Sequence, residues 1–235
     1  NRILTSRIAH IHFAPTEGNR RNLLQEGIDQ NKIFITGNTV IDALLQVVRA
    51  DYRFEEGILN HIDYTNKKVI LLTAHRRENW GRPMENIFEA VREIVCSYPD
   101  TELIFPVHLN PKVQDLAHRI LGEHERIHLI QPLDYEPFAN LMAKAYLILT
   151  DSGGIQEEAP ALGKPVLVLR TETERPEAVQ AGTVKMAGIE KERIIALTKE
   201  LLQDHAKYKE MANAVNPYGD GKAAQRILRI MKQME

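Results

Sequence analysis

The densest group of residues that could do chemistry is the run DSGGIQEEAP, residues 151–160. It follows an apolar run, residues 145–150, that is typical of a buried strand, and a helix is expected to begin at the two glycines. A helix start offers free backbone N–H groups and a positive dipole end, and glycines let an anion approach the backbone closely. Glu157 and Glu158 follow one turn later, where they could accept hydrogen bonds from a polyol such as a ribose. The run therefore predicts binding of a nucleotide or a nucleotide sugar.

A simpler interpretation of the same run stays open. Asp151 and Ser152 could form an ordinary N-cap, with Gln156 or Glu157 completing a loose capping box. Short glycine motifs carry a considerable risk of false matches, so the turn needs support from other parts of the chain.

Polar clusters also follow several of the other expected strands, where open α/β sheets bind their ligands. Residues 73–79 (TAHRREN) contain a histidine suited to acid–base work and arginines suited to a diphosphate, although a solvated loop with an Arg–Glu pair would look the same. Residues 106–111 (PVHLNP) contain His108, which could touch a ligand or cap the helix that follows. Residues 170–177 (RTETERPE) are more typical of a substrate rim than of a plain surface loop, whereas residues 216–221 (NPYGDG) need no ligand and predict a tight turn.

The composition excludes several classes of function. A formal net charge of -2 over 235 residues gives no electrostatic case for binding nucleic acid or an anionic membrane. Cys96 is the single cysteine, so we expect no disulfide and no cysteine-based metal site, and its apolar neighbours predict a buried position. The sequence shows no metal-ligand spacing, P-loop or GxGxxG motif, no apolar run long enough to span a bilayer and no signal peptide. We therefore expect a cytoplasmic protein without a metal or other cofactor.

From Lys68 onward, short β-rich runs alternate with amphipathic helical patterns. Such alternation with short turns is typical of right-handed βαβ units, so we predict a Rossmann-like α/β domain with a parallel sheet and helices on both faces. The expected strands are residues 69–73, 102–106, 127–130, 147–150, 166–169 and 183–186. The expected helices are residues 83–97, 111–121, 135–145, 152–162, 191–203 and 221–234.

Four segments are expected along the chain. Residues 1–49 hold two short strands and two helical patterns, too little to bury a core alone, so we expect them to be the end of a preceding domain. Residues 50–67 are polar and aperiodic, which predicts a linker. The Rossmann-like domain would cover residues 68–220, and residues 221–235 would form a separate C-terminal helix.

Taken together, these motifs closely resemble those of the bacterial non-hydrolysing UDP-N-acetylglucosamine 2-epimerases. The matching words are, in chain order, HFAPTE, ITGNTVIDALL, TAHRREN, PVHLNP, LILTDSGGIQEEAPALGKPVLVLR, TERPEAVQAGT and NPYGDG. The resemblance implies a GT-B arrangement of two Rossmann-like domains, with residues 68–220 as the second domain and residues 1–49 as the C-terminal remnant of the first. It also implies an isomerase that interconverts UDP-GlcNAc and UDP-ManNAc by elimination and re-addition of UDP through 2-acetamidoglucal, without nicotinamide or metal.

The resemblance assigns ligand-binding roles to five residues. Ser152, Gly153 and Gly154 match the positions that would bind phosphate. Glu158 would hold the ribose hydroxyls, and the backbone and ring near Phe138 would hold the uracil.

Five further residues match family positions with other roles. His75 would lie by the diphosphate and assist the departure of UDP as the catalytic residue. Arg76 and His108 match positions tied to a second, allosteric UDP-GlcNAc. Arg175 and Glu177 match residues of the substrate cleft, without a separable role.

One departure from the family pattern leaves two hypotheses open. The acidic residues that the family's first domain uses for proton transfer at C2 match nothing in this sequence, which begins at Asn1 without a methionine, so we expect a truncated chain. The first hypothesis is part of an active 2-epimerase, and the second is a module that binds UDP or a UDP-sugar without turnover. The resemblance further implies a homodimer and a place in the supply of sugars for cell envelope polysaccharides.

Overall fold

The computed structural model describes residues 1–234, which form two compact units. Unit 2 comprises Val47–Val215, and unit 1 comprises Asn1–Gln46 together with the residues from Asn216 onward. No helix among the described residues has the length and apolar character needed to cross a membrane. Nor does that part of the chain contain a group of three or more His, Cys, Asp or Glu residues placed to hold a metal ion.

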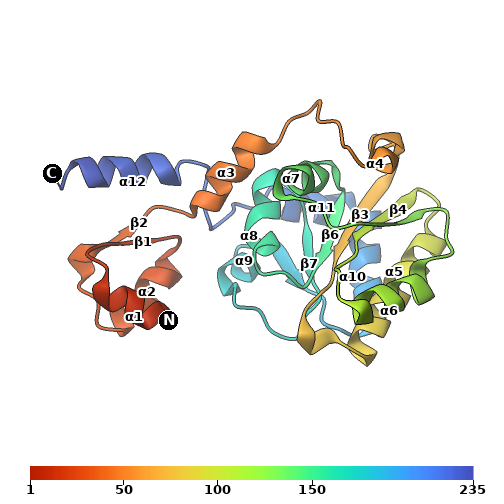
Figure 1. Ribbon diagram of the computed structural model, residues 1–235, viewed down its shortest axis with the longest axis horizontal. Coiled ribbons are helices and arrows are strands. Elements are labelled where there is room, and N and C mark those ends of the chain that lie inside the picture. The colour runs from red at the N-terminus through yellow and green to blue at the C-terminus, as the bar shows by residue number, and fades with distance from the viewer. Residues whose placement is uncertain (235) are drawn as a thin grey trace. The chain divides into compact units, whose positions relative to one another are not determined.

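Unit 2 is built on a six-stranded, fully parallel sheet (Figure 1). Its strand order is β5-β4-β3-β6-β7-β8, so the chain moves outward in one direction from β3 and then in the other from β6. Such a reversal creates a crevice at the carboxyl ends of the two central strands, where open α/β sheets bind ligands. The strands are β3 (Lys68–Thr73), β4 (Thr101–Pro106), β5 (Ile127–Ile130), β6 (Leu147–Thr150), β7 (Val166–Val168) and β8 (Val184–Met186).

The strands form because their apolar runs are covered on both faces, as parallel sheets require. On one face Ile70, Leu103 and Leu149 belong to a core cluster with side chains of α5, α6 and α10. On the other face Leu71 and Ile148 are fully buried, and α7 packs against β3. The helices of this unit are α4 (Gly57–His61), α5 (Arg82–Ser97), α6 (Pro111–Leu121), α7 (Tyr135–Lys144), α8 (Ile155–Glu158), α9 (Pro176–Gln180), α10 (Lys191–Gln203) and α11 (His205–Ala212), with 3₁₀ turns η2 (Arg77–Asn79) and η3 (Ala159–Leu162).

Unit 1 pairs two short parallel strands, β1 (His12–Ala14) and β2 (Ile33–Ile35). Its helices are α1 (Arg2–Ile8), α2 (Glu17–Gln25), α3 (Thr39–Val47, whose last residue belongs to unit 2) and α12 (Ala223–Lys232), with the 3₁₀ turn η1 (Gln30–Lys32). The carboxylate of Asp42 on α3 accepts the N–H groups of Ala223 (3.1 Å) and Ala224 (2.9 Å), and so caps α12 from another helix. The N–H of Asn38 donates to the carbonyl of Tyr218 (2.7 Å), which ties the turn before α12 to the turn before α3.

The predicted parallel α/β fold is confirmed, and three local expectations differ from the structure. Residues 50–67 lie within unit 2 and contain α4: Leu59 is fully buried and Lys144 donates to the carbonyl of Ala50 (3.4 Å). The Asn60 side chain bonds both the N–H and the carbonyl of Phe54 (2.9 and 2.7 Å) and orders the segment internally. The helix expected over residues 152–162 is only α8, followed by η3, since Pro160 lacks the N–H that would continue it. Cys96 is exposed, because the helical phase that buries Ile94 turns it outward.

Candidate functional site

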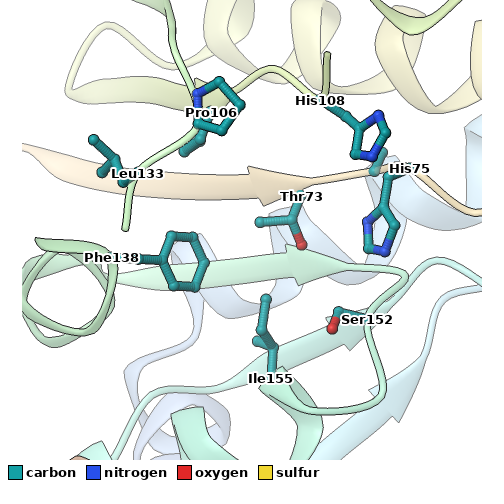
Figure 2. A pocket seen from close by; sticks show the side chains of 10 residues that line it. Thr73, His75, Pro106, His108, Leu133, Phe138, Ser152 and Ile155 are labelled. Carbon is teal, nitrogen blue, oxygen red and sulfur yellow. The ribbon is translucent and has the colours of Figure 1, made fainter. Parts of the chain in front are cut away.

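A cavity of about 220 Å³ opens at the carboxyl ends of the central strands of unit 2. Its walls come from the ends of β3 and β4, the segment after β5, helix α7 and the turn after β6. Figure 2 shows two histidine rings at one end of the cavity, with Phe138 and Leu133 at the other. The lining residues are Thr73, Ala74, His75, Pro106, His108, Pro132, Leu133, Phe138, Ser152 and Ile155.

The two histidines that line the cavity lie face to face. The ring centroids of His75 and His108 are 5.7 Å apart and the rings are within 13° of parallel. Nδ1 of His108 accepts the N–H of Asn110, and it is the Asn110 side chain that caps α6 by accepting the N–H of Lys112. The capping interpretation of His108 is therefore wrong, because Asn110 caps the helix, and the His108 imidazole lines the cavity.

A buried aspartate lies directly behind His75. The side chain of Asp151 is fully buried, and its Oδ2 accepts the backbone N–H groups of His75 (2.9 Å) and Arg76 (2.8 Å) and the Asn79 amide (3.2 Å). Its Oδ1 lies 3.1 Å from Nδ1 of His75 but is not aligned for a hydrogen bond, and no other group among residues 1–234 is its partner. Burial alone would raise the pKa of Asp151, but the His75 ring and the two backbone N–H groups more than offset it and hold this pKa below its ordinary value. A buried anion therefore holds the backbone of His75 and lies beside its ring.

The Ser-Gly-Gly turn joins β6 to α8 and leaves backbone donors free. The N–H of Ser152 donates to the Thr150 hydroxyl (2.9 Å), whereas the N–H groups of Gly153 and Gly154 have no acceptor within the described chain. Neither glycine has a positive φ, so the backbone conformation alone does not require them. The glycines instead keep space next to the backbone, as expected for an anion site. Because α8 has only four residues, the dipole contributes less here than a long helix would.

Two arginines from other strand ends contact Glu174, whose carboxylate lies beside this turn. Arg76, after β3, donates from Nε to the carbonyl of Asp151 (3.3 Å), and its Nη2 lies 3.5 Å from Oε1 of Glu174. Arg170, after β7, donates from Nη1 to Oε2 of Glu174 (2.5 Å) and also lies 3.3 Å from Glu78. Positive charge from two loops thus gathers beside Gly153, with an acidic side chain between the guanidinium groups.

Glu158 is placed on the other side of the turn, near Gly154. A Cβ built on Gly154 would lie 3.5 Å from Oε1 of Glu158, and the Tyr135 hydroxyl donates to Oε2 of Glu158 (3.1 Å). Burial raises the pKa of Glu158. The hydrogen bond from the Tyr135 hydroxyl offsets this only in part, and the nearby charge of Glu157 adds to the rise. Burial together with the Glu158 carboxylate raises the pKa of Tyr135 to about 12. Within the described residues Glu158 has no cationic partner, so its oxygens can accept hydrogen bonds from neutral hydroxyl groups.

The structure brings together some of the predicted site residues and separates others. His75, His108, Phe138 and Ser152 share the cavity wall. Arg76 with Gly153, and Glu158 with Gly154, flank the turn at its edge. The other two predicted residues, Arg175 and Glu177, lie at the start of α9 and do not line the cavity, and Arg175 forms an ion pair with the buried Glu157. Glu157 is therefore occupied structurally, which leaves Glu158 as the carboxylate available to a ligand.

Sequence reasoning did not single out three residues that the structure places at this site. Asp151 was considered only as a helix cap, although an acidic residue directly after a central strand is a usable signal. Tyr135 lies 23 residues from its partner Glu158, and nothing in its local pattern indicates that contact. Glu174 has a local partner, Arg170, four residues before it, but its approach to Gly153 and Arg76 is not visible in the sequence.

Comparisons with known proteins place the chain in a family. The sequence model of the family described as UDP-N-acetylglucosamine 2-epimerase matches residues 1–232. The UDP-N-acetylglucosamine 2-epimerase of Bacillus subtilis is 54% identical over 228 residues, which cover 97% of this chain and 59% of the relative. Solved structures include a putative UDP-N-acetylglucosamine 2-epimerase from Listeria monocytogenes (TM-score 0.94, 55% identity, covering 100% of this chain and 62% of that one). Another is the S. aureus MnaA–UDP co-structure (TM-score 0.92, 51% identity, covering 99% and 62%).

The chain thus spans about three fifths of the length of the curated relatives it matches. The match nevertheless includes nearly every residue of this chain, from the β1 strand through the Ser-Gly-Gly turn to α12. The chain belongs to the UDP-N-acetylglucosamine 2-epimerase family.

Proposed function

We propose that unit 2 binds the UDP portion of UDP-GlcNAc at the carboxyl ends of β3 and β6. The observation that carries this proposal is the turn after β6, where two free backbone N–H groups and Ser152 adjoin Arg76 and the cavity. Backbone N–H groups and arginine together bind phosphate groups, because they supply both directional donors and positive charge. Glu158 accepts hydrogen bonds from the ribose hydroxyls in this proposal.

The apolar end of the cavity suits a flat base. Phe138 and Leu133 form this end, and the cavity is smaller than the roughly 300–1,000 Å³ of pockets that enclose a whole drug-sized ligand. We therefore assign the uracil to this end and place the diphosphate and sugar at the open edge. The co-structure of the S. aureus relative with UDP supports the choice of nucleotide.

As part of a 2-epimerase, the site interconverts UDP-GlcNAc and UDP-ManNAc by elimination and re-addition of UDP. His75 is the group in the cavity best placed to assist the departing diphosphate, because its ring lines the cavity and the buried Asp151 carboxylate lies 3.1 Å from its Nδ1. In this proposal Arg76 and His108 bind a second, regulatory UDP-GlcNAc. Arg175 and Glu177 belong to the substrate cleft. The protein acts as a cytoplasmic homodimer in the supply of envelope polysaccharide sugars.

A second candidate is UDP binding without turnover by this chain. This candidate is favoured by the absence of any carboxylate from the cavity wall among the described residues. Removal of the C2 proton and its return to the opposite face need groups that act as base and acid, each typically worth about 10²–10⁴-fold in rate. The cavity supplies only the two imidazoles for this purpose, as far as the described part of the chain goes.

Calorimetric titration of this chain with UDP tests the binding proposal. Ser152→Ala and Glu158→Ala should weaken UDP binding by about threefold to tenfold each, because each removes one hydrogen-bonding group from the ligand. The matched controls are Ser97→Ala and Glu125→Ala, which change the same residue types at exposed positions outside the cavity. Equal affinities for all four variants and the parent chain would rule out the proposed nucleotide site.

An NMR assay for UDP-ManNAc formation from UDP-GlcNAc on the same sample separates the two candidates. Binding of UDP without conversion supports the binding module, and conversion shows that the imidazoles and their neighbours suffice for catalysis.

A further inference from the structure

Gly153 is close to a carboxylate in this ligand-free structure. A Cβ built on Gly153 would lie 2.5 Å from Oε1 of Glu174, closer than any real side chain could come. Gly153 does not have a positive φ, so its backbone conformation does not require a glycine, and the contact is with the end of a flexible side chain. The space next to the turn is therefore filled by Glu174, which lies in the loop after β7.

The Glu174 carboxylate is held there by the two arginines that gather at the turn. Oε2 accepts from Arg170 (2.5 Å), and Oε1 lies 3.5 Å from Nη2 of Arg76. Partial burial opposes ionisation of Glu174, but hydrogen bonds from its own backbone and from Arg170 hold its pKa below the ordinary value. Glu174 is thus an anion at neutral pH, bound by groups that would also bind a phosphate.

We propose that Glu174 is an internal competitor for the diphosphate, occupying a phosphate position until the nucleotide displaces it. Carboxylates and phosphates are both bound by the planar fork of arginine, so one can replace the other at the same guanidinium groups. A diphosphate carries enough charge to take over both arginines, whereas a neutral nucleoside leaves Glu174 in place. This inference rests on the proposed binding of UDP at the turn.

Glu174 therefore sets which ligands bind well at this site. It lowers the affinity of any anion that uses Arg76 and Arg170, and it leaves the affinity for the uridine portion unchanged. Its side chain is 42% exposed and its loop belongs to neither a strand nor a helix, so the carboxylate can withdraw without disturbing the core.

Titration of the full chain and two glutamine variants with UDP and with uridine tests the proposal. Glu174→Gln removes the competing charge and should tighten UDP binding by about fivefold to tenfold, because two partly exposed arginine pairs no longer have to be broken. Uridine affinity should stay within about twofold. The matched control is Glu172→Gln, which makes the same charge change two positions away in the same loop, at an exposed side chain with no partner among the described residues.

The outcomes distinguish this inference from the proposed function. If Glu174→Gln weakens UDP binding, or changes it no more than Glu172→Gln does, Glu174 is not a competitor and the inference fails while UDP binding stands. If neither the parent chain nor either variant binds UDP, the proposed function fails and the inference fails with it. Thermal melting of each variant confirms that the compared proteins are folded.

Discussion

Replacement of Asp151 should reveal how much the buried carboxylate behind His75 contributes to the stability of unit 2. Its Oδ2 accepts three hydrogen bonds, from the N–H groups of His75 and Arg76 and from the Asn79 amide. Asp151→Ala leaves all three donors without this acceptor, and each buried unsatisfied donor costs about 1–3 kcal/mol. Because His75 and Arg76 are only half-buried, water can reach part of the gap, so we expect a total loss of about 3–5 kcal/mol.

Asp151→Asn separates the charge from the hydrogen bonds. The amide oxygen can still accept at the Oδ2 position, so the expected loss is about 1–2 kcal/mol. The folded-state pKa of Asp151 is lowered, so its ionisation stabilises the fold above the unfolded pKa, about 3.9, and this contribution is lost as the pH falls through the folded pKa. The difference between the parent chain and Asp151→Asn should therefore be constant from about pH 5.5 to 7 and shrink below about pH 4.

Urea unfolding followed by tryptophan fluorescence is a suitable assay. Trp80 is the single tryptophan, and it lies directly after Asn79 in unit 2. The control is Asp115→Ala, which changes an exposed aspartate on α6 and should alter the free energy of unfolding by less than about 0.5 kcal/mol. An Asp151→Ala protein that unfolds within about 0.5 kcal/mol of the parent would refute the view that this carboxylate is an essential buried acceptor.

The remaining predictions concern Glu158 and Asp42. Burial raises the folded-state pKa of Glu158, so its charge destabilises the fold at neutral pH. Glu158→Gln should therefore raise the free energy of unfolding at pH 7, with the gain vanishing below the unfolded pKa of about 4.3, while it weakens UDP binding in calorimetry. A stabilised variant that binds UDP as before would remove Glu158 from the site. Asp42→Ala removes the carboxylate that caps α12 and should lower the stability of this helix by about 1–2 kcal/mol. The loss should appear as faster amide hydrogen exchange over residues 223–226. Unchanged exchange there would contradict the capping role.

Much of the fold could be predicted because its determinants are local. Apolar runs such as residues 147–150, bounded by polar turn residues, predict buried strands, and the structure confirms β6 at these bounds. Asn110 and Pro111 mark a helix start by cap chemistry and fixed φ, and α6 begins there. Local reasoning failed in two places. Pro160 interrupts the expected helix, so α8 is shorter than predicted, and the helical phase of α5 turns Cys96 toward solvent.

The site depends on contacts that no local pattern contains. From its motifs the sequence determined that a polar, glycine-rich turn follows a central strand and that a histidine follows another. Only the tertiary structure decided that Asp151 supports His75, 76 residues away, and that Glu174 fills the space beside Gly153. The physical reason is that a parallel sheet brings strand ends together according to strand order, and neither strand order nor the reach of a loop side chain is encoded within a single segment.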